Sequence, residues 1–233
     1  MKTRHHLTCG RSAEQRGFSL VELSVVLVVI AAIMGAVMSG MNVYRQAALQ
    51  RMFSEFVMGW RSTYQSYVAV SHNIQPGDDP GNPRYAINGA AGSAMCGTQL
   101  MNAMLANGIA LPEGRGPELH DRYVYTDQSG APHELRVCLV TVPWSIPGAS
   151  VGTYRTAPRH VLRMEGLTPS AAISLDALVD GRVDARFGDL REDAQAASTS
   201  AATAQWSRDA NARFNNLSEG QEVELVGFLL LGR

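Results

Sequence analysis

The amino-acid sequence predicts an α+β fold in which one long N-terminal α-helix packs on an antiparallel β-sheet. Three observations lead to this prediction. Residues 18–71 contain no proline and only isolated glycines, which favours an uninterrupted helix. Beyond residue 45, large apolar residues recur at steps of three and four, which is the spacing of a helix with one buried face. The remaining chain alternates short β-rich segments with turn signals, as an antiparallel sheet does.

These patterns divide the chain into three expected parts. Residues 1–17 form a short, polar and basic leader, and residues 18–72 form the long helix. Residues 73–233 form a globular α+β head. About 160 residues suffice for one domain with its own core, and we find no internal repeat or second boundary in them.

The first half of the expected helix is apolar enough to cross a membrane. Residues 25–38 carry no polar side chain, and the run from about residue 20 to 41 is long enough to span about 30 Å of hydrocarbon. Four of the 20 basic side chains and one of the 21 acidic ones lie in the leader, which predicts a cytoplasmic N-terminus. The alternative is an ordinary signal peptide cut near Gly40, but the helical pattern continues beyond that point.

Glu22 places one carboxylate near the start of this apolar run. A charged side chain at the bilayer centre costs roughly 2.5–3.5 kcal/mol on insertion scales, so such a residue is treated first as a functional candidate. The alternative is that Glu22 lies near the lipid headgroups and is merely tolerated there.

The sequence Arg16-Gly17-Phe18-Ser19-Leu20-Val21-Glu22, followed by about nineteen mostly apolar residues, resembles the signature of type IV prepilins. Pilins and the pseudopilins of type II secretion share this signature, which here covers roughly residues 17–41. The resemblance implies that a prepilin peptidase cuts between Gly17 and Phe18 and N-methylates the new Phe18 amine. It also implies a pilin-like fold and assembly of the mature subunits, helix against helix, into a filament at an inner-membrane platform.

A cut after Gly17 gives Glu22 a possible partner. The new α-amino group has a reference pKa of about 7.7–8.0 and is cationic near neutral pH. In a bundle of staggered helices, Glu22 of one subunit can meet the Phe18 amine of the next. Mispaired neighbours would leave two uncompensated buried charges, so the pairing favours one register. We therefore predict an assembly role for Glu22.

The second half of the helix is amphipathic. One face carries a stripe of large apolar residues, and the opposite face is polar, which is the pattern of a helix packed on a core. We expect the stripe to pack under the protein's own sheet rather than to form a partner-binding groove. Its members are Leu49, Phe53, Phe56, Trp60, Tyr64 and Tyr67.

Two cysteines remain once the leader, which contains Cys9, is removed. These two, Cys96 and Cys138, can form a pair, and their domain is expected to face the oxidising periplasm, where disulfides form. A disulfide between them would close a loop of about 43 residues and stabilise the fold by about 3–4 kcal/mol in the chain-entropy model. The alternative is two separate buried thiols.

The head begins with a loop rich in proline and glycine at residues 75–83. Asp78 and Asp79 within it are expected to initiate turns, with a Ca²⁺ site as the alternative. We then expect a short helix at residues 98–107 and a helix opened by Thr168 and Pro169 and closed at Gly181. Strands are expected at residues 122–126, 133–142, 159–165 and 222–231.

The last expected strand is the most apolar and should lie inside the sheet, which the long helix covers on one face. Asp176, Asp180 and Asp184 would share a helical face only if that helix continued, which Gly181 opposes. Residues 189–212 are rich in Ala, Ser and Thr, and they fit either a surface helix or a mobile excursion.

Known catalytic signals are missing from the sequence. It contains no phosphate-binding glycine loop, nucleophile elbow, His-Glu-x-x-His motif or cysteine pair with metal spacing. His120, His133 and His160 have no visible partner at a meaningful spacing, so we expect ordinary surface or strand histidines. We expect no enzyme activity, no cofactor, no metal and no main role in nucleic-acid binding.

These observations favour a structural subunit, major or minor, of a type IV pilus-like filament. Its expected partners are other pilin subunits, the prepilin peptidase, the inner-membrane assembly platform and, before assembly, the membrane. Two alternatives remain open: a pseudopilin of a type II secretion system, and an anchored periplasmic domain that never polymerises.

Overall fold

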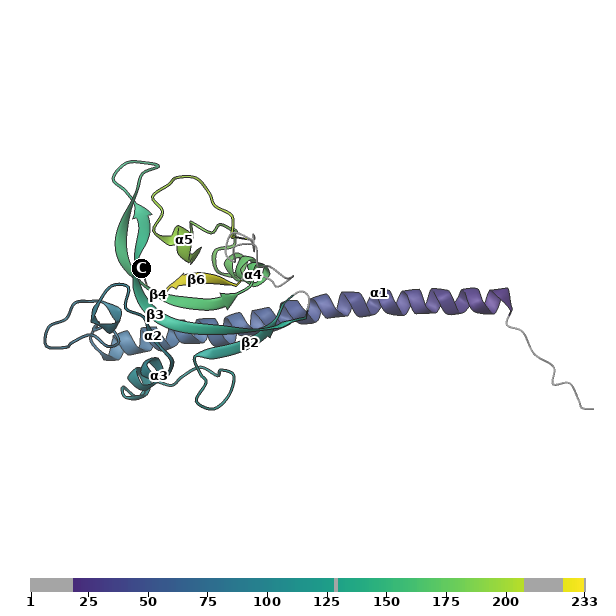
Figure 1. The fold of residues 1–233 in the computed structure, drawn as a ribbon, viewed down its shortest axis with the longest axis horizontal. Coiled ribbons are helices and arrows are strands. Elements are labelled where there is room, and N and C mark those ends of the chain that lie inside the picture. Colours follow the sequence, from purple (N-terminus) through teal and green to yellow (C-terminus); the bar gives the residue numbers. More distant parts are fainter. Residues whose placement is uncertain (1–18, 128–129, 208–223, 233) are drawn as a thin grey trace, which may run out of the picture. The chain divides into compact units, whose positions relative to one another are not determined.

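The computed structural model describes residues 19–127, 130–207 and 224–232 of the chain. The chain divides into two compact units, Met1–Tyr44 and Arg45–Arg233. The α+β architecture is confirmed: a long N-terminal helix is followed by a six-stranded antiparallel sheet (Figure 1).

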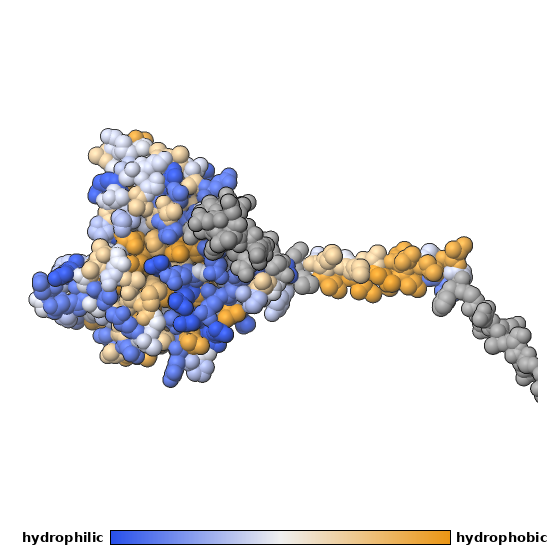
Figure 2. Space-filling model, viewed as in Figure 1, coloured by the Kyte–Doolittle hydropathy of each residue, from blue (hydrophilic) through white to orange (hydrophobic). Residues whose placement is uncertain are grey.

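Helix α1 (Leu20–Arg51) carries the apolar run in its first part. The described side chains from Leu20 to Gly40 are all exposed, and Figure 2 shows this stretch as an almost continuous hydrophobic surface. By length and composition alone, the helical stretch Leu20–Val70 is the one stretch among the described residues that could cross a membrane.

A π-helical turn, η1 (Met52–Val57), separates α1 from α2 (Met58–Val70). A π-turn adds a residue to one helical turn and so rotates the residues that follow it. Met52 and Val57, which the expected stripe omits, are fully buried, whereas Phe53 is only partly buried. All members of the expected stripe lie in or against the main core, and the π-turn adds Met52 and Val57 to it.

Helix α2 ends with a left-handed residue, His72, at a φ of 55°. The amide of Asn73 donates to the carbonyl of Val68 at 2.9 Å, which is the long-range bond of a Schellman motif. This motif stops the helix before the proline-rich loop.

The sheet has the strand order β1-β3-β4-β6-β5, with β2 also paired to β3. Every described pairing is antiparallel. Strand β6 pairs on both sides, with β4 and β5, so the prediction that the most apolar strand lies inside the sheet is confirmed. The strands are β1 (Met95–Cys96), β2 (Arg122–Thr126), β3 (Pro132–Pro147), β4 (Tyr154–Leu167), β5 (Leu190–Glu192) and β6 (Leu225–Leu230).

The main core lies on one face of the sheet. Alternate residues of β3, such as Leu135, Val137 and Leu139, contribute to it together with Phe56 and Trp60 of the long helix. The expectation that the aromatic stripe packs under the protein's own sheet is confirmed for these residues. Helix α3 (Gly97–Leu105) and helix α4 (Pro169–Asp180) complete this core.

A smaller apolar cluster lies on the opposite face, because successive side chains of a strand point to opposite faces. It includes Val140, Val142 and Trp144 of β3 and is partly covered by the short helix α5 (Asp193–Ala196). The guanidinium of Arg191 stacks over Trp144 at 4.1 Å and donates to the carbonyl of Ser145 at 2.9 Å.

Strands β3 and β4 form a long hairpin that extends beyond their neighbours. Pro143 lies directly opposite Pro158 in this pair. The expected strands, residues 133–142 and 159–165, end before Pro143 and begin after Pro158, where proline cannot donate to a strand ladder. In the structure both strands continue through their prolines, and the hairpin closes at Gly148–Thr153, where the amide of Gly148 donates to the carbonyl of Thr153.

Of the two alternatives for residues 189–212, the surface helix is not found in the described part. Residues 190–192 form β5, residues 193–196 form the short helix α5, and residues 197–207 follow an irregular course. Residues 208–212 of that range lie outside the described residues. Backbone hydrogen bonds to carboxylates, described below, hold this segment instead of a surface helix.

Candidate processing and assembly site

The described part of the N-terminal site begins at Ser19. The Ser19 hydroxyl accepts the amide of Val21 at 3.3 Å, and the Ser19 carbonyl accepts the amide of Leu23 at 3.1 Å. Ser19 therefore caps α1, which begins at Leu20. Gly17 and Phe18, the expected cleavage and methylation residues, lie outside the described residues.

Glu22 lies in the first turn of α1, three residues after the cap. A carboxylate in the first turn interacts favourably with the positive end of the helix dipole, and Ser-x-x-Glu is the spacing of a capping box. Sequence reasoning missed this local role, although the spacing was visible. Glu22 is exposed in the isolated chain, so any assembly role requires a second molecule.

No charged residue occurs between Glu22 and Arg45. Ser24 is polar, but its hydroxyl donates to the carbonyl of Val21 at 2.8 Å. Glu22 is thus the sole ionisable side chain on an exposed apolar stretch of more than twenty residues.

In the second unit, Cys96 and Cys138 form a disulfide, with their Cα atoms 4.5 Å apart. The two residues lie directly opposite each other on β1 and β3, at the spacing of a non-hydrogen-bonded antiparallel pair. The structure therefore contains the expected bridge rather than two separate thiols. It ties the start of α3 to the middle of the sheet.

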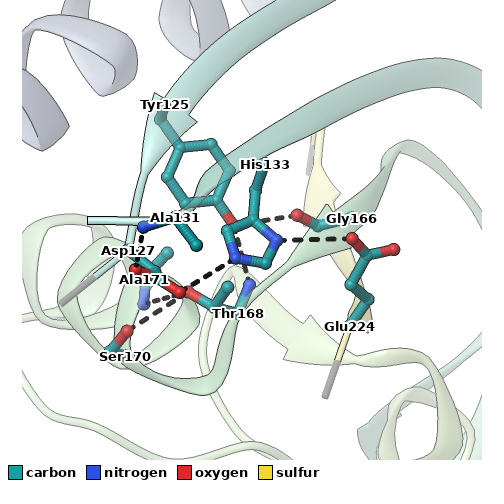
Figure 3. A network of polar contacts seen from close by, with 9 residues as sticks. All are labelled: Tyr125, Asp127, Ala131, His133, Gly166, Thr168, Ser170, Ala171 and Glu224. Carbon is teal, nitrogen blue, oxygen red and sulfur yellow. Dashed lines mark hydrogen bonds and ion pairs between the residues drawn. The ribbon is translucent and has the colours of Figure 1, made fainter. Parts of the chain in front are cut away.

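A polar network joins β2, β3, β4 and α4 (Figure 3). The Tyr125 hydroxyl donates to the carbonyl of Gly166 and accepts the amide of Thr168, both at 2.8 Å. The hydroxyl of Thr168 in turn accepts the amide of Ala171 and caps α4. Tyr125 therefore fixes the turn between β4 and α4.

His133 belongs to the same network. Its ring stacks on Tyr125 with centroids 5.7 Å apart, and its nitrogens contact Asp127 at 3.1 Å and Glu224 at 3.3 Å (Figure 3). The other two histidines named above contact Pro112 and Thr141, respectively. All three therefore have polar partners within the chain, which their spacing in the sequence did not reveal.

The acidic residues singled out from the sequence accept hydrogen bonds from backbone amides and so hold loops in place. Asp78 accepts the amides of Asp79, Arg84 and Tyr85, so it holds the loop as a turn-forming residue does. Burial alone would raise the pKa of Asp78, but these backbone hydrogen bonds outweigh burial and lower it.

The three aspartates of the second acidic group do not share one helix. Helix α4 ends at Gly181 with a φ of 71°, as expected. Asp176 accepts the amide of Asp184 and the indole N–H of Trp206, both at 2.8 Å, and Asp180 accepts the amides of Asp189 and Leu190. These bonds fasten residues 184–206 to α4. Among the described residues, no three potential ligands cluster closely enough to hold a metal ion.

Comparison with known proteins supports the signal at the N-terminus. Residues 13–38 match a family model described as the prokaryotic N-terminal methylation motif. No curated protein and no solved structure matches the chain. The chain therefore carries a type IV prepilin-like signal and is consistent with a pilin-like protein. The motif indicates a processed, membrane-anchored structural protein that assembles with other pilin subunits, rather than an enzyme.

Proposed function

We propose that this protein is a major or minor subunit of a type IV pilus-like filament. The observation that carries the proposal is the combination of a methylation motif at residues 13–38 with an α-helix whose apolar side chains are exposed from Leu20 onwards. Because each fully buried Val, Leu or Ile contributes about 1.5–3 kcal/mol, this surface requires lipid or neighbouring helices.

Before assembly, the helix spans the inner membrane with its N-terminus in the cytoplasm and its head in the periplasm. The basic leader supports this orientation, and the Cys96–Cys138 disulfide fits an oxidising compartment. The prepilin peptidase first processes the chain. During assembly at an inner-membrane platform, the helices of sister subunits then replace the lipid contacts. The function is mechanical, and catalysis has no part in it.

Within the filament, Glu22 pairs with the Phe18 amine of a neighbouring subunit. A carboxylate and an ammonium group attract each other, and an apolar setting penalises either charge alone. Their pairing selects the one stagger of helices that leaves no charge unmatched. Apolar packing supplies the driving force, and the charge pair supplies the register.

The test must separate this pairing from the local capping role of Glu22. Glu22→Gln retains a hydrogen-bonding side chain at the capping-box position but removes the charge, whereas Glu22→Ala removes both. Ser24→Ala is the matched control, because the Ser24 hydroxyl bonds within its own helix. Each variant is co-expressed with a prepilin peptidase and a pilus assembly platform.

Two quantities are measured: the mass of the N-terminal peptide and the amount of subunit in the sheared filament fraction. We expect N-methyl-Phe18 at the terminus of every variant, and loss of filaments in both Glu22 variants but not in Ser24→Ala. Normal filaments from Glu22→Gln would refute the charge pairing. An intact Met1, or a cut near Gly40, would refute processing as a prepilin. Incorporation only with a type II secretion platform would assign the chain to the pseudopilins, and incorporation with neither would make it an anchored domain.

A further inference from the structure

A groove, which we call the α3 groove, lies beside helix α3 and entirely within the second unit. Its volume is about 650 Å³, and its lining comes from α3 and from the segment between α3 and β2. Met101, Leu105 and Leu111 form its apolar part, and Leu105 is 56% exposed. Exposed apolar side chains in a concave site are typical of a surface that binds a partner.

The outer wall of the α3 groove, residues 106–121, is fixed to the rest of the head. The indole N–H of Trp60 donates to the carbonyl of His120 at 3.0 Å. The ring nitrogen Nδ1 of His120 lies 2.9 Å from the carbonyl oxygen of Pro112, so the wall is also tied to itself. The groove is therefore a preformed feature of the folded head.

The open charge at the α3 groove is negative. Glu118 is the one carboxylate among the described residues that line the groove. It is exposed and forms no ion pair with a described residue. Arg115 is the sole lysine or arginine in residues 97–121, and it lies 2.6 Å from Glu134 instead. The groove thus suits an apolar group that is accompanied by a cation.

The tip of the β3–β4 hairpin has the complementary features. Val151 is fully exposed there, and glycine, alanine and serine beside it keep the tip narrow. Residues 143–164 contain three arginines and no acidic residue. Of these arginines, Arg155 is the nearest to the tip in sequence, is exposed and forms no ion pair with a described residue.

The hairpin tip lies far from the α3 groove of its own head. Strand β6 pairs with β4 only as far as Val161, so the hairpin projects beyond its neighbours. Figure 1 shows the tip and α3 at opposite margins of the second unit. A tip and a groove therefore meet only between two molecules.

We propose that the α3 groove receives the hairpin tip of a second copy of this chain, with Val151 against the apolar lining and Arg155 paired with Glu118. Charge complementarity favours this occupant, because arginine binds carboxylates through charge-assisted hydrogen bonds. The contact joins two different surfaces, and a heterologous contact of this kind propagates along an open filament. The inference rests on the proposed function, since a filament supplies the neighbouring copy.

The experiment joins the two surfaces by a disulfide in assembled filaments. Full chains carrying Val151→Cys and full chains carrying Leu105→Cys are co-expressed with the prepilin peptidase and the assembly platform, and the sheared filaments are oxidised mildly. We expect a cross-linked dimer only when both variants are present. In the control, Val183→Cys replaces Leu105→Cys, because Val183 is exposed but does not line the groove.

Filaments that form without this cross-link overturn the contact and leave the proposed function standing. The contact is also overturned if Val151→Cys chains cross-link to one another, or if they cross-link equally to Val183→Cys chains. Absence of filaments from the natural chain refutes the proposed function, and this contact with it.

Charge reversal tests the pairing of Arg155 with Glu118 in the same filaments. Arg155→Glu in the Val151→Cys copy, or Glu118→Arg in the Leu105→Cys copy, should lower the cross-linked fraction by about fivefold. The two reversals together should restore it. Glu113→Arg is the matched control, because Glu113 is exposed on the same segment but does not line the groove. Single reversals without effect, or a double reversal without recovery, would overturn the proposal.

Discussion

At the scale of single residues, Tyr125 shows how one hydroxyl holds two elements together. It is 5% exposed and bridges Gly166 to Thr168 at the junction of β4 and α4. Tyr125→Phe leaves the buried amide of Thr168 without this acceptor, so we expect a loss of about 1–3 kcal/mol in the free energy of unfolding. Tyr123→Phe is the control on the same strand, since the Tyr123 hydroxyl has no hydrogen bond to a described residue. Equal denaturation midpoints for the two variants would contradict this role.

Asp176 makes the stability of the head depend on pH. Burial, followed by the nearby Asp180, raises the pKa of Asp176 to about 7 against the hydrogen bonds from Trp206 and Asp184. An unfolded Asp ionises near pH 3.9, so the native state retains a proton between these two values. The resulting stability is present at low pH and is lost as pH rises through about 7.

We therefore expect the thermal midpoint to fall between pH 6 and pH 8. Asp176→Asn mimics the protonated acid and can still accept from Trp206 and Asp184, so its midpoint should change less over this range and exceed that of the natural chain at pH 8. Asp79→Asn, at an exposed position, should retain the natural pH dependence. If the thermal midpoint of Asp176→Asn fell with pH as steeply as that of the natural chain, another group would be responsible.

At the scale of elements, the sequence predicts the helices and strands that have a clear hydrophobic period or a capping residue. The ends of α4 follow from Thr168 and Gly181, and β2 follows from residues 122–126. Strands β1 and β5 could not be predicted, because two or three residues carry no period. The π-turn at Met52–Val57 has no sequence signature, and tertiary packing decides it. The strands expected at residues 133–142 and 159–165 are longer in the structure, because a single sequence does not reveal which prolines face a free edge.

The disulfide links strands β1 and β3 and is expected to contribute several kcal/mol to the free energy of unfolding. Cys96 and Cys138 are 42 residues apart, so the double variant to Ser should lose about 3–4 kcal/mol in the free energy of unfolding. Reductant should lower the midpoint of the natural chain in chemical denaturation but leave that of the double variant unchanged. Cys9→Ser in the leader should have no effect on the mature protein. A midpoint insensitive to reductant in the natural chain would contradict the contribution of the bridge.

At the scale of the whole molecule, the two units follow different physical rules. The second unit buries its own core, whereas the apolar part of the first unit buries nothing within the chain. Composition predicts this contrast directly, because a long uncharged stretch adjoins an amphipathic one. The candidate assembly residue, Glu22, was also predictable, since a lone carboxylate stands out in such a stretch.

Pro143 and Pro158 face each other across the hairpin and limit how strands of neighbouring heads can pair with it. Each proline lacks the amide that an edge strand would offer to an incoming chain. Since they lie opposite each other, the nitrogen of each points to the outer margin of the hairpin, and both margins are interrupted at the same height. Many copies of the head packed at high local concentration therefore present no continuous template for cross-β aggregation, and the extended hairpin can project among its neighbours without joining their sheets.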